Sequence, residues 1–387
     1  MSRASLFSFY EFFAGGGMAR AGLGADWTCR LANDLDPAKA AAYRTNWGEG
    51  DLIEANVWDL TPEDLPGTAD LVWASSPCQD LSLAGPRAGL SGQRSSAFWG
   101  FWRLIEALDE QGRAPGVIVI ENVVGLLTSR GGHDFTAICE ALAAHNYRFG
   151  ALEINAAHFV PQSRPRLFLI ATRSEALACA EPGPWHGTSA RLAAARLPDA
   201  LKPFWRWWRL PQPDARNAAL GDLLEPDDQV IWHLPEQTQA ILALMAPLHR
   251  HRLEQAAAQA RLDGQRQVGA LFRRTRQEQG RTQQRAEVRF DGLAGCLRTA
   301  RGGSSRQTVV VIDPTFEDAA VRTRLMSPRE GARLMGLGDD YILPKGAAAA
   351  LTLVGDGVVV PVVAFLERHL LRQMVKACQS TRQAAQD

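Results

Sequence analysis

The sequence predicts an α/β fold: a doubly wound, Rossmann-like parallel sheet with a smaller second domain. Over the first 174 of 387 residues, short apolar runs alternate with helix-like stretches, which is typical of a sheet covered by helices. A glycine-rich turn follows the first apolar run, at a place where such folds bind ligands. After Arg173 prolines become frequent and the alternation fades, so we expect a domain boundary near residue 174.

The expected elements follow from apolar periodicity and from the positions of glycine and proline. We expect strands at 7–13, 27–32, 71–74, 117–120 and 166–172. Helical spacing occurs at 18–23, 37–47, 96–108 and 324–341, and proline at position 37 suits a first helical turn. The stretch 358–376 is read as an apolar strand followed by an amphipathic helix. We therefore assign 1–174, completed by 346–387, to the first domain and 175–345 to the smaller one.

Composition excludes several classes of protein. Lys and Arg (42) balance Asp and Glu (42), so the chain as a whole is no polycation. We find no apolar stretch of bilayer length and no secretory signal pattern, and so expect a cytoplasmic protein without a membrane partner. The six cysteines are scattered without a C-x-x-C pair, which predicts reduced thiols and no metal site.

Charge is unevenly distributed along the chain. The segment 250–306 contains thirteen Arg and five acidic residues. Such a segment is either a solvated helix face or a surface that faces nucleic acid, and the sequence leaves both readings open. Phe204–Arg209 interleaves aromatic residues with arginines, and we expect a packed helix edge along which the Arg stems lie.

Cys78 is the leading candidate for a catalytic residue. It follows the expected strand 71–74 through Ser75-Ser76-Pro77, at the edge where an open α/β sheet places its ligands. A thiolate there would be a strong nucleophile. Glu121 directly follows the next buried strand, so a carboxyl group and a thiol are expected at two strand ends.

The glycine turn and Asp34 indicate a cofactor site. Glycines at 15–17 let the backbone approach a ligand and leave N–H groups at the start of a helix. Asp34 ends the second expected strand and is placed either to accept hydrogen bonds from ribose hydroxyls or to cap the next helix. Together the two features suggest a cofactor that contains adenosine.

Four motifs occur in a fixed order along the chain: Phe13-Ala14-Gly15-Gly16-Gly17, Pro77-Cys78-Gln79, Glu121-Asn122-Val123 and Gln162-Ser163-Arg164-Pro165-Arg166. In this order and spacing they resemble the DNA cytosine-5 methyltransferase family of bacterial and phage type. The resemblance covers 7–174 and returns at 285–366, with Arg324–Gly336 and Gly355–Val362. It implies an S-adenosylmethionine-dependent methyltransferase domain with a smaller target-recognition domain.

The resemblance also implies a covalent mechanism. The Cys78 thiolate would attack C6 of cytosine, which makes C5 nucleophilic enough to accept a methyl group from S-adenosylmethionine. Glu121 would be the acid at N3, Arg166 would contact O2, and Arg164 would support the base and the nearby loop. The sequence does not identify the base that removes the C5 proton, and water is one candidate.

Further residues acquire roles by the same resemblance. Phe13 would stack on the adenine, Leu35 stands where the family often carries Trp, and Asn56-Val57 stands where an Asp-Ile pair commonly reads the adenine edge. These departures bear on cofactor affinity and not on the type of reaction. The implied cofactor-binding residues are Phe13, Ala14, Gly15, Gly17, Asp34, Leu35, Asn56, Val57, Pro77, Ala97 and Asp356.

The resemblance implies a DNA interface as well. The target base would have to leave the duplex stack, and Asp80–Arg94 has the composition either of a lid over it or of a plain surface loop. Arg289–Arg298 resembles the family's recognition core, with Cys296-Leu297 in place of the usual Thr-Leu. The expected DNA contacts are Gln79, Ser82, Arg94, Arg298, Gly302, Gly303 and Arg306.

We therefore expect a monomer that methylates C5 of cytosine in a specific duplex DNA sequence. It would act in a restriction-modification system beside a cognate endonuclease, or as a solitary enzyme. A tRNA cytosine-5 methyltransferase is the first alternative, although the Cys-Phe-Thr signature of that branch is absent from the sequence. A catalytically inactive DNA-binding protein is the second.

Overall fold

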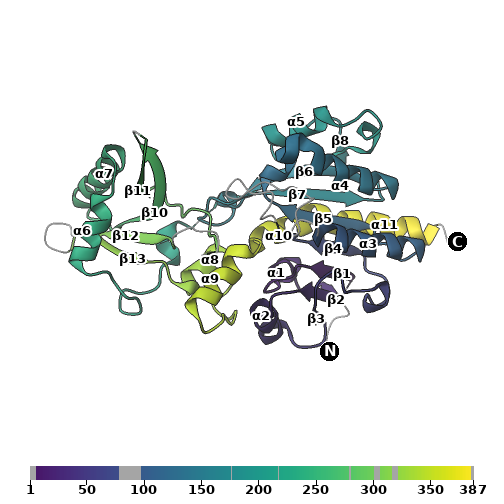
Figure 1. Ribbon diagram of the computed structural model, residues 1–387, viewed down its shortest axis with the longest axis horizontal. Helices are drawn as coiled ribbons and strands as arrows, with labels where there is room; N and C mark the ends of the chain where they lie inside the picture. The colour runs from purple at the N-terminus through teal and green to yellow at the C-terminus, as the bar shows by residue number, and fades with distance from the viewer. Residues whose placement is uncertain are drawn as a thin grey trace. The chain divides into compact units, whose positions relative to one another are not determined.

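The computed structural model describes residues 6–77, 97–175, 177–216, 218–278, 280–299, 306–315 and 321–384. The chain divides into two compact units (Figure 1). The first comprises Met1–Asn155, Pro165–Asp214 and Val358–Asp387, and the second comprises Ala156–Arg164 and Ala215–Gly357. These bounds differ from the expected domain limits, because 175–214 groups with the first unit, whereas 156–164 and 346–357 group with the second. The assignment of two folding domains stays a prediction.

The first unit is built on a sheet that, within the described residues, has seven strands in the order β3-β2-β1-β4-β5-β7-β6. Pairing is parallel from β3 to β5 and antiparallel at β7. This mostly parallel sheet confirms the predicted α/β class. The strands are β1 (Phe7–Phe12), β2 (Trp27–Asp34), β3 (Leu52–Glu54), β4 (Leu71–Ala74), β5 (Val117–Asn122), β6 (Arg148–Asn155) and β7 (Pro165–Thr172).

Helices cover both faces of this sheet. One face shares a core with α3 (Ala97–Glu110), α4 (His133–Ala144) and α5 (Thr188–Arg196). The other contacts α1 (Met18–Leu23), α2 (Pro37–Trp47) and the C-terminal helices α10 (Val360–Leu366) and α11 (Arg372–Ala384). On that second face Trp27 Nε1 donates to Glu367 at 2.9 Å, so the last helical segment closes a layer begun by the first strands.

Two of the expected helices have the bounds predicted for them. α2 begins at Pro37, and the Asp36 side chain caps it by accepting hydrogen bonds from the Ala38 and Lys39 amides. α1 follows the glycine turn directly and ends before Gly24, whose φ of 81° suits a residue without a Cβ. Local sequence therefore suffices for the elements that border the carboxyl ends of β1 and β2.

The strand expected at the start of 358–376 is wrong. This run is helix α10, with Pro361 in its first turn and Val362, Val363 and Leu366 buried. A run of β-branched residues has the composition of a strand, but packing decides here because α10 lies against α1. Gly22 makes the close approach possible, since an added Cβ would lie 2.4 Å from Val363 Cβ.

The expectation of no apolar stretch long enough for a membrane is also wrong on length and composition. The helical stretch Ala347–Thr381 is long enough to cross a membrane, and its apolar window has a mean hydropathy of 2.1. Of that window, 56% is buried inside the protein, and a core helix of a globular protein can be equally long and apolar. The stretch is therefore weak evidence for a membrane span.

The second unit is built on an antiparallel sheet that, among the described residues, has the order β11-β10-β12-β13. Leu271, Ala286 and Val310 share a core with Leu253 and Ala260 of α7. The 324–341 region, expected to be helix-like, begins at the end of a strand and continues into α8. The elements are α6 (Pro235–Ala243), α7 (Pro247–Asp263), β10 (Gln267–Glu278), β11 (Arg281–Arg289), β12 (Thr308–Ile312), β13 (Val321–Leu325), α8 (Pro328–Leu334) and α9 (Ala347–Asp356).

The aromatic and arginine stretch 204–209 is packed, as expected, but not as a helix edge. Trp207–Trp208 form strand β9, which pairs with β8 (Ala178–Cys179). Trp208 is buried and Phe204 and Trp205 pack against the core, while Arg206 forms an ion pair with Glu175 at 3.1 Å. Arg206 therefore forms its ion pair within the first unit.

Replacing Gly22 by Ala should destabilise the first unit by about 1–3 kcal/mol, because the new methyl group overlaps Val363 and the Val360 carbonyl. Urea unfolding measures this change. Gly50→Ala is the matched control, since a Cβ there meets nothing within 4 Å. Equal stability of the two variants would contradict the close packing of α1 on α10.

Candidate active site

The candidate site lies where β1, β4 and β5 end. β1 is the first strand of the chain and lies inside the sheet. β2 and β3 follow on one side of β1 and β4 lies on its other side, so the direction of strand addition reverses between β1 and β4. In open α/β sheets ligands bind outside the carboxyl ends of the strands at such a switch point. The glycine turn and the Ser76-Pro77 segment follow strands at this edge, and Glu121 is the last residue but one of β5.

The glycine turn is shaped by left-handed backbone and by Asp34. Phe13, Gly15 and Gly17 have φ values of 58°, 57° and 76°. Asp34 Oδ2 accepts the Gly15 amide at 2.8 Å and Oδ1 accepts the Asp36 amide at 2.9 Å. The Asp34 carboxylate therefore fixes the turn, and its remaining lone pairs are what a ribose could use.

Trp47, at the end of α2, supports the turn from beneath, and the sequence analysis missed it. Its Nε1 donates to the Gly16 carbonyl at 3.0 Å. A Cβ on Gly17 would lie 2.3 Å from that nitrogen, so the turn and the indole ring are in direct contact. By contrast, a Cβ on Gly15 would meet nothing within 4 Å, so the space beside this residue is open. An aromatic residue at the last position of an expected helix gave no signal of this contact.

The other cofactor candidates of the first unit lie on the same edge of the sheet. Leu35 is 63% exposed, and Asn56 is exposed with its Oδ1 accepting the Trp58 amide at 3.1 Å. Ala14 and Val57 are buried, and Ala97 begins α3. Asp356 is exposed at the end of α9 and belongs to the second unit. The cofactor roles of all these residues stay predictions.

Glu11 is a buried carboxyl group that the sequence analysis did not assign to the site. It lies in β1 among buried residues, and its Oε2 has no hydrogen-bond partner among the described residues. Burial raises the pKa of Glu11 to about 8, and the Arg20 guanidinium opposes this shift. Glu11 therefore carries a proton near neutral pH, behind the glycine turn. A single acidic residue inside the apolar run 7–13 was the available signal.

Glu121 and Arg166 are brought together by the antiparallel pair β5 and β7. Glu121 is 6% exposed, and its Oε1 lies 3.2 Å from Arg166 Nε. The strands pair in a register that sets Glu121 opposite Phe168, so the side chain two residues earlier on β7 reaches the carboxylate. Arg166 thus fixes the direction of the Glu121 carboxyl group.

The segment that leads to Cys78 is attached to the same strand end. Asn122 Nδ2 donates to the Ser76 carbonyl at 3.3 Å and to Ser76 Oγ at 3.2 Å. Pro77 is exposed. Cys78, Gln79, Ser82 and Arg94 lie outside the described residues, as do Gly302 and Gly303.

Arg164 contacts backbone carbonyls of the second unit. It is 2% exposed and donates to the carbonyls of Leu297, Gly355 and Gly357 at 2.9, 3.0 and 2.8 Å. Gln162 is fully buried beside it and accepts the Leu297 amide at 3.0 Å. Arg164 is therefore a positioning residue for the 297 segment, and its contact with the base stays a prediction.

The remaining DNA-contact candidates that are described lie on the second unit. Arg298 and Arg306 are both exposed, and Arg306 donates to the Met326 carbonyl at 3.3 Å. Among the described residues no group of three or more His, Cys, Asp or Glu could hold a metal ion.

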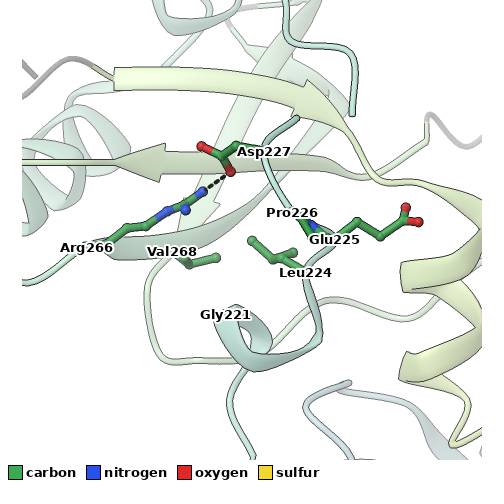
Figure 2. Close-up of a pocket in the computed structure, with 7 residues that line it drawn as sticks. All are labelled: Gly221, Leu224, Glu225, Pro226, Asp227, Arg266 and Val268. Carbon is green, nitrogen blue, oxygen red and sulfur yellow. Dashed lines mark hydrogen bonds and ion pairs between the residues drawn. The ribbon is translucent and has the colours of Figure 1, made fainter. Parts of the chain in front are cut away.

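A cavity of about 630 Å³ in the second unit contains none of the predicted site residues (Figure 2). Within it Arg266 donates to Asp227 at 2.7 Å, and Glu225 is a second acidic residue of the lining. The lining residues are Gly221, Leu224, Glu225, Pro226, Asp227, Arg266 and Val268. Cavity size alone therefore does not locate the chemistry in this protein.

The chain is similar to known methylases over most of its length. A family model described as C-5 cytosine-specific DNA methylase matches residues 7–372. The type II methyltransferase M.HhaI of Haemophilus parahaemolyticus is 23% identical over 372 residues, which cover 94% of this chain and 93% of that protein. M.AluI of Cellulosimicrobium cellulans is 34% identical over 186 residues, 44% of this chain and 35% of that protein.

A solved structure shows the same fold. The methyltransferase EhMeth of Entamoeba histolytica superimposes with a TM-score of 0.60 at 16% identity. The match covers 95% of this chain and 98% of that chain.

The raised pKa of Glu11 predicts a pH-dependent stability. The unfolded chain releases this proton near pH 4.5, whereas the folded protein keeps it up to about pH 8. The contribution of Glu11 to the free energy of unfolding is therefore fully present below pH 4.5 and is lost as the pH rises to 8. Its upper bound is about 1.4 kcal/mol per pKa unit. The free energy of unfolding of Glu11→Gln should fall less between pH 5 and pH 8 than that of the wild type.

Urea unfolding at pH 5, 6.5 and 8 provides the measurement. Glu63→Gln, at an exposed position, is the control and should follow the wild type. Parallel curves for the wild type and Glu11→Gln would contradict a protonated, buried Glu11.

Proposed function

We propose a covalent mechanism for this chain, which belongs to the C-5 cytosine-specific DNA methylase family and is a DNA cytosine-5 methyltransferase. The Cys78 thiolate forms a transient bond to C6 of a cytosine that has left the DNA stack. The single observation that best supports this proposal is the Glu121–Arg166 pair at the end of β5, beside the strand end that leads to Cys78.

Attack of the thiolate on C6 removes the aromaticity of the ring, and negative charge develops towards N3. An acid at N3 stabilises that charge, and Glu121 is positioned for this role by Arg166. Carbon C5 then becomes the nucleophile of an enamine. After C5 is methylated, a base removes the C5 proton, and the electrons of that bond expel the Cys78 thiolate from C6.

Residues at the ends of β1 and β2 would hold S-adenosylmethionine, which supplies the methyl group. The Asp34 carboxylate and the glycine turn form an edge with open space beside Gly15, and these features fit an adenosine ribose. Phe13 is partly buried beside them and offers a ring face to the adenine. Leu35 presents an exposed aliphatic group to the same space.

A cytosine within a duplex cannot reach these groups while it is stacked. The proposal therefore requires the base to flip out, at a cost of about a few kcal/mol. The relatives named type II methyltransferases favour a role in restriction-modification, with a cognate endonuclease as partner. A solitary enzyme is the alternative.

Gly17→Ala should weaken the binding of S-adenosylmethionine about tenfold or more, because a left-handed alanine costs roughly 1–2 kcal/mol and its methyl group displaces Trp47. Calorimetric titration measures the affinity, and circular dichroism verifies the fold. Gly48→Ala is the matched control, with a φ of 90° and open space for a Cβ. Equal affinities for the two variants would contradict the proposed cofactor turn.

Cys78→Ser should abolish methylation while DNA binding remains, and Glu121→Gln should lower kcat by roughly 10²–10⁴-fold through loss of the acid at N3. The readout is sequencing of methylated cytosines on a mixed-sequence duplex incubated with S-adenosylmethionine, with tRNA tested in parallel. Cys179→Ser, at a partly exposed free thiol, is the control and should keep wild-type activity.

A duplex that carries 5-fluorocytosine tests the covalent bond itself. A base cannot remove fluorine from C5 as it removes a proton, so the adduct with Cys78 should persist in denaturing gels. Unchanged methylation by Cys78→Ser would refute the mechanism, and methylation of tRNA alone would refute the DNA substrate.

A further inference from the structure

A two-stranded ribbon extends from the sheet of the second unit. β10 pairs with β12 over Gln267–Leu271 but with β11 over Ala270–Glu278. In the described part of the chain, the distal halves of β10 and β11 therefore pair only with each other (Figure 1). Such a ribbon has two faces, because successive side chains on a strand point to opposite sides.

One face of the ribbon is rich in arginine. Arg274 lies directly opposite Arg285, and the same face carries Arg276 and Arg281. We call these four residues the arginine face. Glu287 is on this side too: it forms an ion pair with Arg274 at 3.3 Å and accepts a hydrogen bond from Arg276 at 2.6 Å. The strand position opposite Arg281 on this face is also acidic, Glu278. Like charges directly opposite each other destabilise a strand pair, so this arrangement favours an anion as its partner.

The other face of the ribbon carries Arg273, opposite Ala286 near its base, and is otherwise polar and uncharged at the described pairs further out. Thr275 lies opposite Gln284, and Gln277 lies opposite Thr282. We call these four residues the amide face. Nearer the sheet, this side becomes the core that Leu271 and Ala286 share with α7. The two faces thus differ in chemistry although they belong to the same two strands.

The arginine face is on the same side of the sheet as the 292–299 segment. Phe272 shares that face, and a Cβ on Gly295 would lie 2.1 Å from Phe272 Cζ. The segment carries exposed Arg298 and is fixed by Gln162 and Arg164. The arginine face and the segment that resembles a recognition core therefore share one side of the sheet.

A cavity of about 460 Å³ at the base of the ribbon is lined both by Arg274 of the arginine face and by residues of α7. Arg252, Arg274 and Arg289 line it together with His249, next to the rings of Phe272 and Phe290. Guanidinium groups beside aromatic rings suit the phosphates and sugars of a nucleic acid. Glu287 and Asp291 also line the cavity, so its charge is mixed.

We propose that the arginine face contacts the backbone phosphates of the duplex, with the amide face turned away. This inference rests on the proposed function, since it takes duplex DNA as the substrate. Arginines that neutralise phosphates release counterions, so this contact should weaken as the salt concentration rises. The contact contributes affinity without sequence information.

The test compares two double variants of the full chain on the same strand. R274Q/R276Q removes two charges from the arginine face, and T275A/Q277A alters the amide face beside them. DNA affinity is measured against salt concentration on a duplex of mixed sequence. The log–log slope should fall by about 1.8 for R274Q/R276Q, because each lost phosphate contact removes about 0.9. T275A/Q277A should keep the wild-type slope.

A second arginine-face variant, R281Q/R285Q, guards against an effect of leaving Glu287 without its two partners. It should lower the slope to a similar extent, and thermal melting verifies that all variants fold. An unchanged slope in both arginine variants, or a loss confined to T275A/Q277A, would overturn the inference. Absence of DNA methylation by the wild type would instead refute the proposed function, so the two failures are distinguishable.

Discussion

Burial of the central strands on both faces is the constraint on which the rest of this structure depends. Every residue of β1 and of β5 is buried, and backbone groups are satisfied by pairing within the sheet. Polar groups can therefore reach solvent only where these strands end. The glycine turn, Ser76 and Glu121 occupy those ends, so one physical rule gathers the candidate chemistry at one edge.

Charged groups that do remain inside are fixed by specific partners. Arg324 forms a fully buried pair with Glu330, and Arg164 is surrounded by backbone carbonyls. Removing one partner of such an arrangement leaves a buried charge, so these contacts specify geometry more than they add stability. Glu11 differs because burial keeps its carboxyl group protonated and therefore uncharged near neutral pH.

The two faces of the small sheet in the second unit differ in chemistry. One face of β10 and β11 supplies Leu271, Ala286 and Val288 to a core with α7. The opposite face carries arginines and lies against the segment around Gly295. Because side chains alternate along a strand, a shift of one residue in register would exchange the two faces. The register of β10 on β11 therefore determines which chemistry is exposed.

The sequence by itself determined the fold class, the bounds of α1 and α2, and the strand ends that carry Asp34 and Glu121. These features are local, because apolar runs, a capping Asp36 and a proline act through near neighbours. Only the tertiary structure decided that the apolar run at 360–366 is a helix, since its packing on Gly22 outweighs strand composition. Likewise, the contacts of Trp47 with Gly16 and of Arg166 with Glu121 join residues 31 and 45 positions apart, and long-range packing has no local sequence signal.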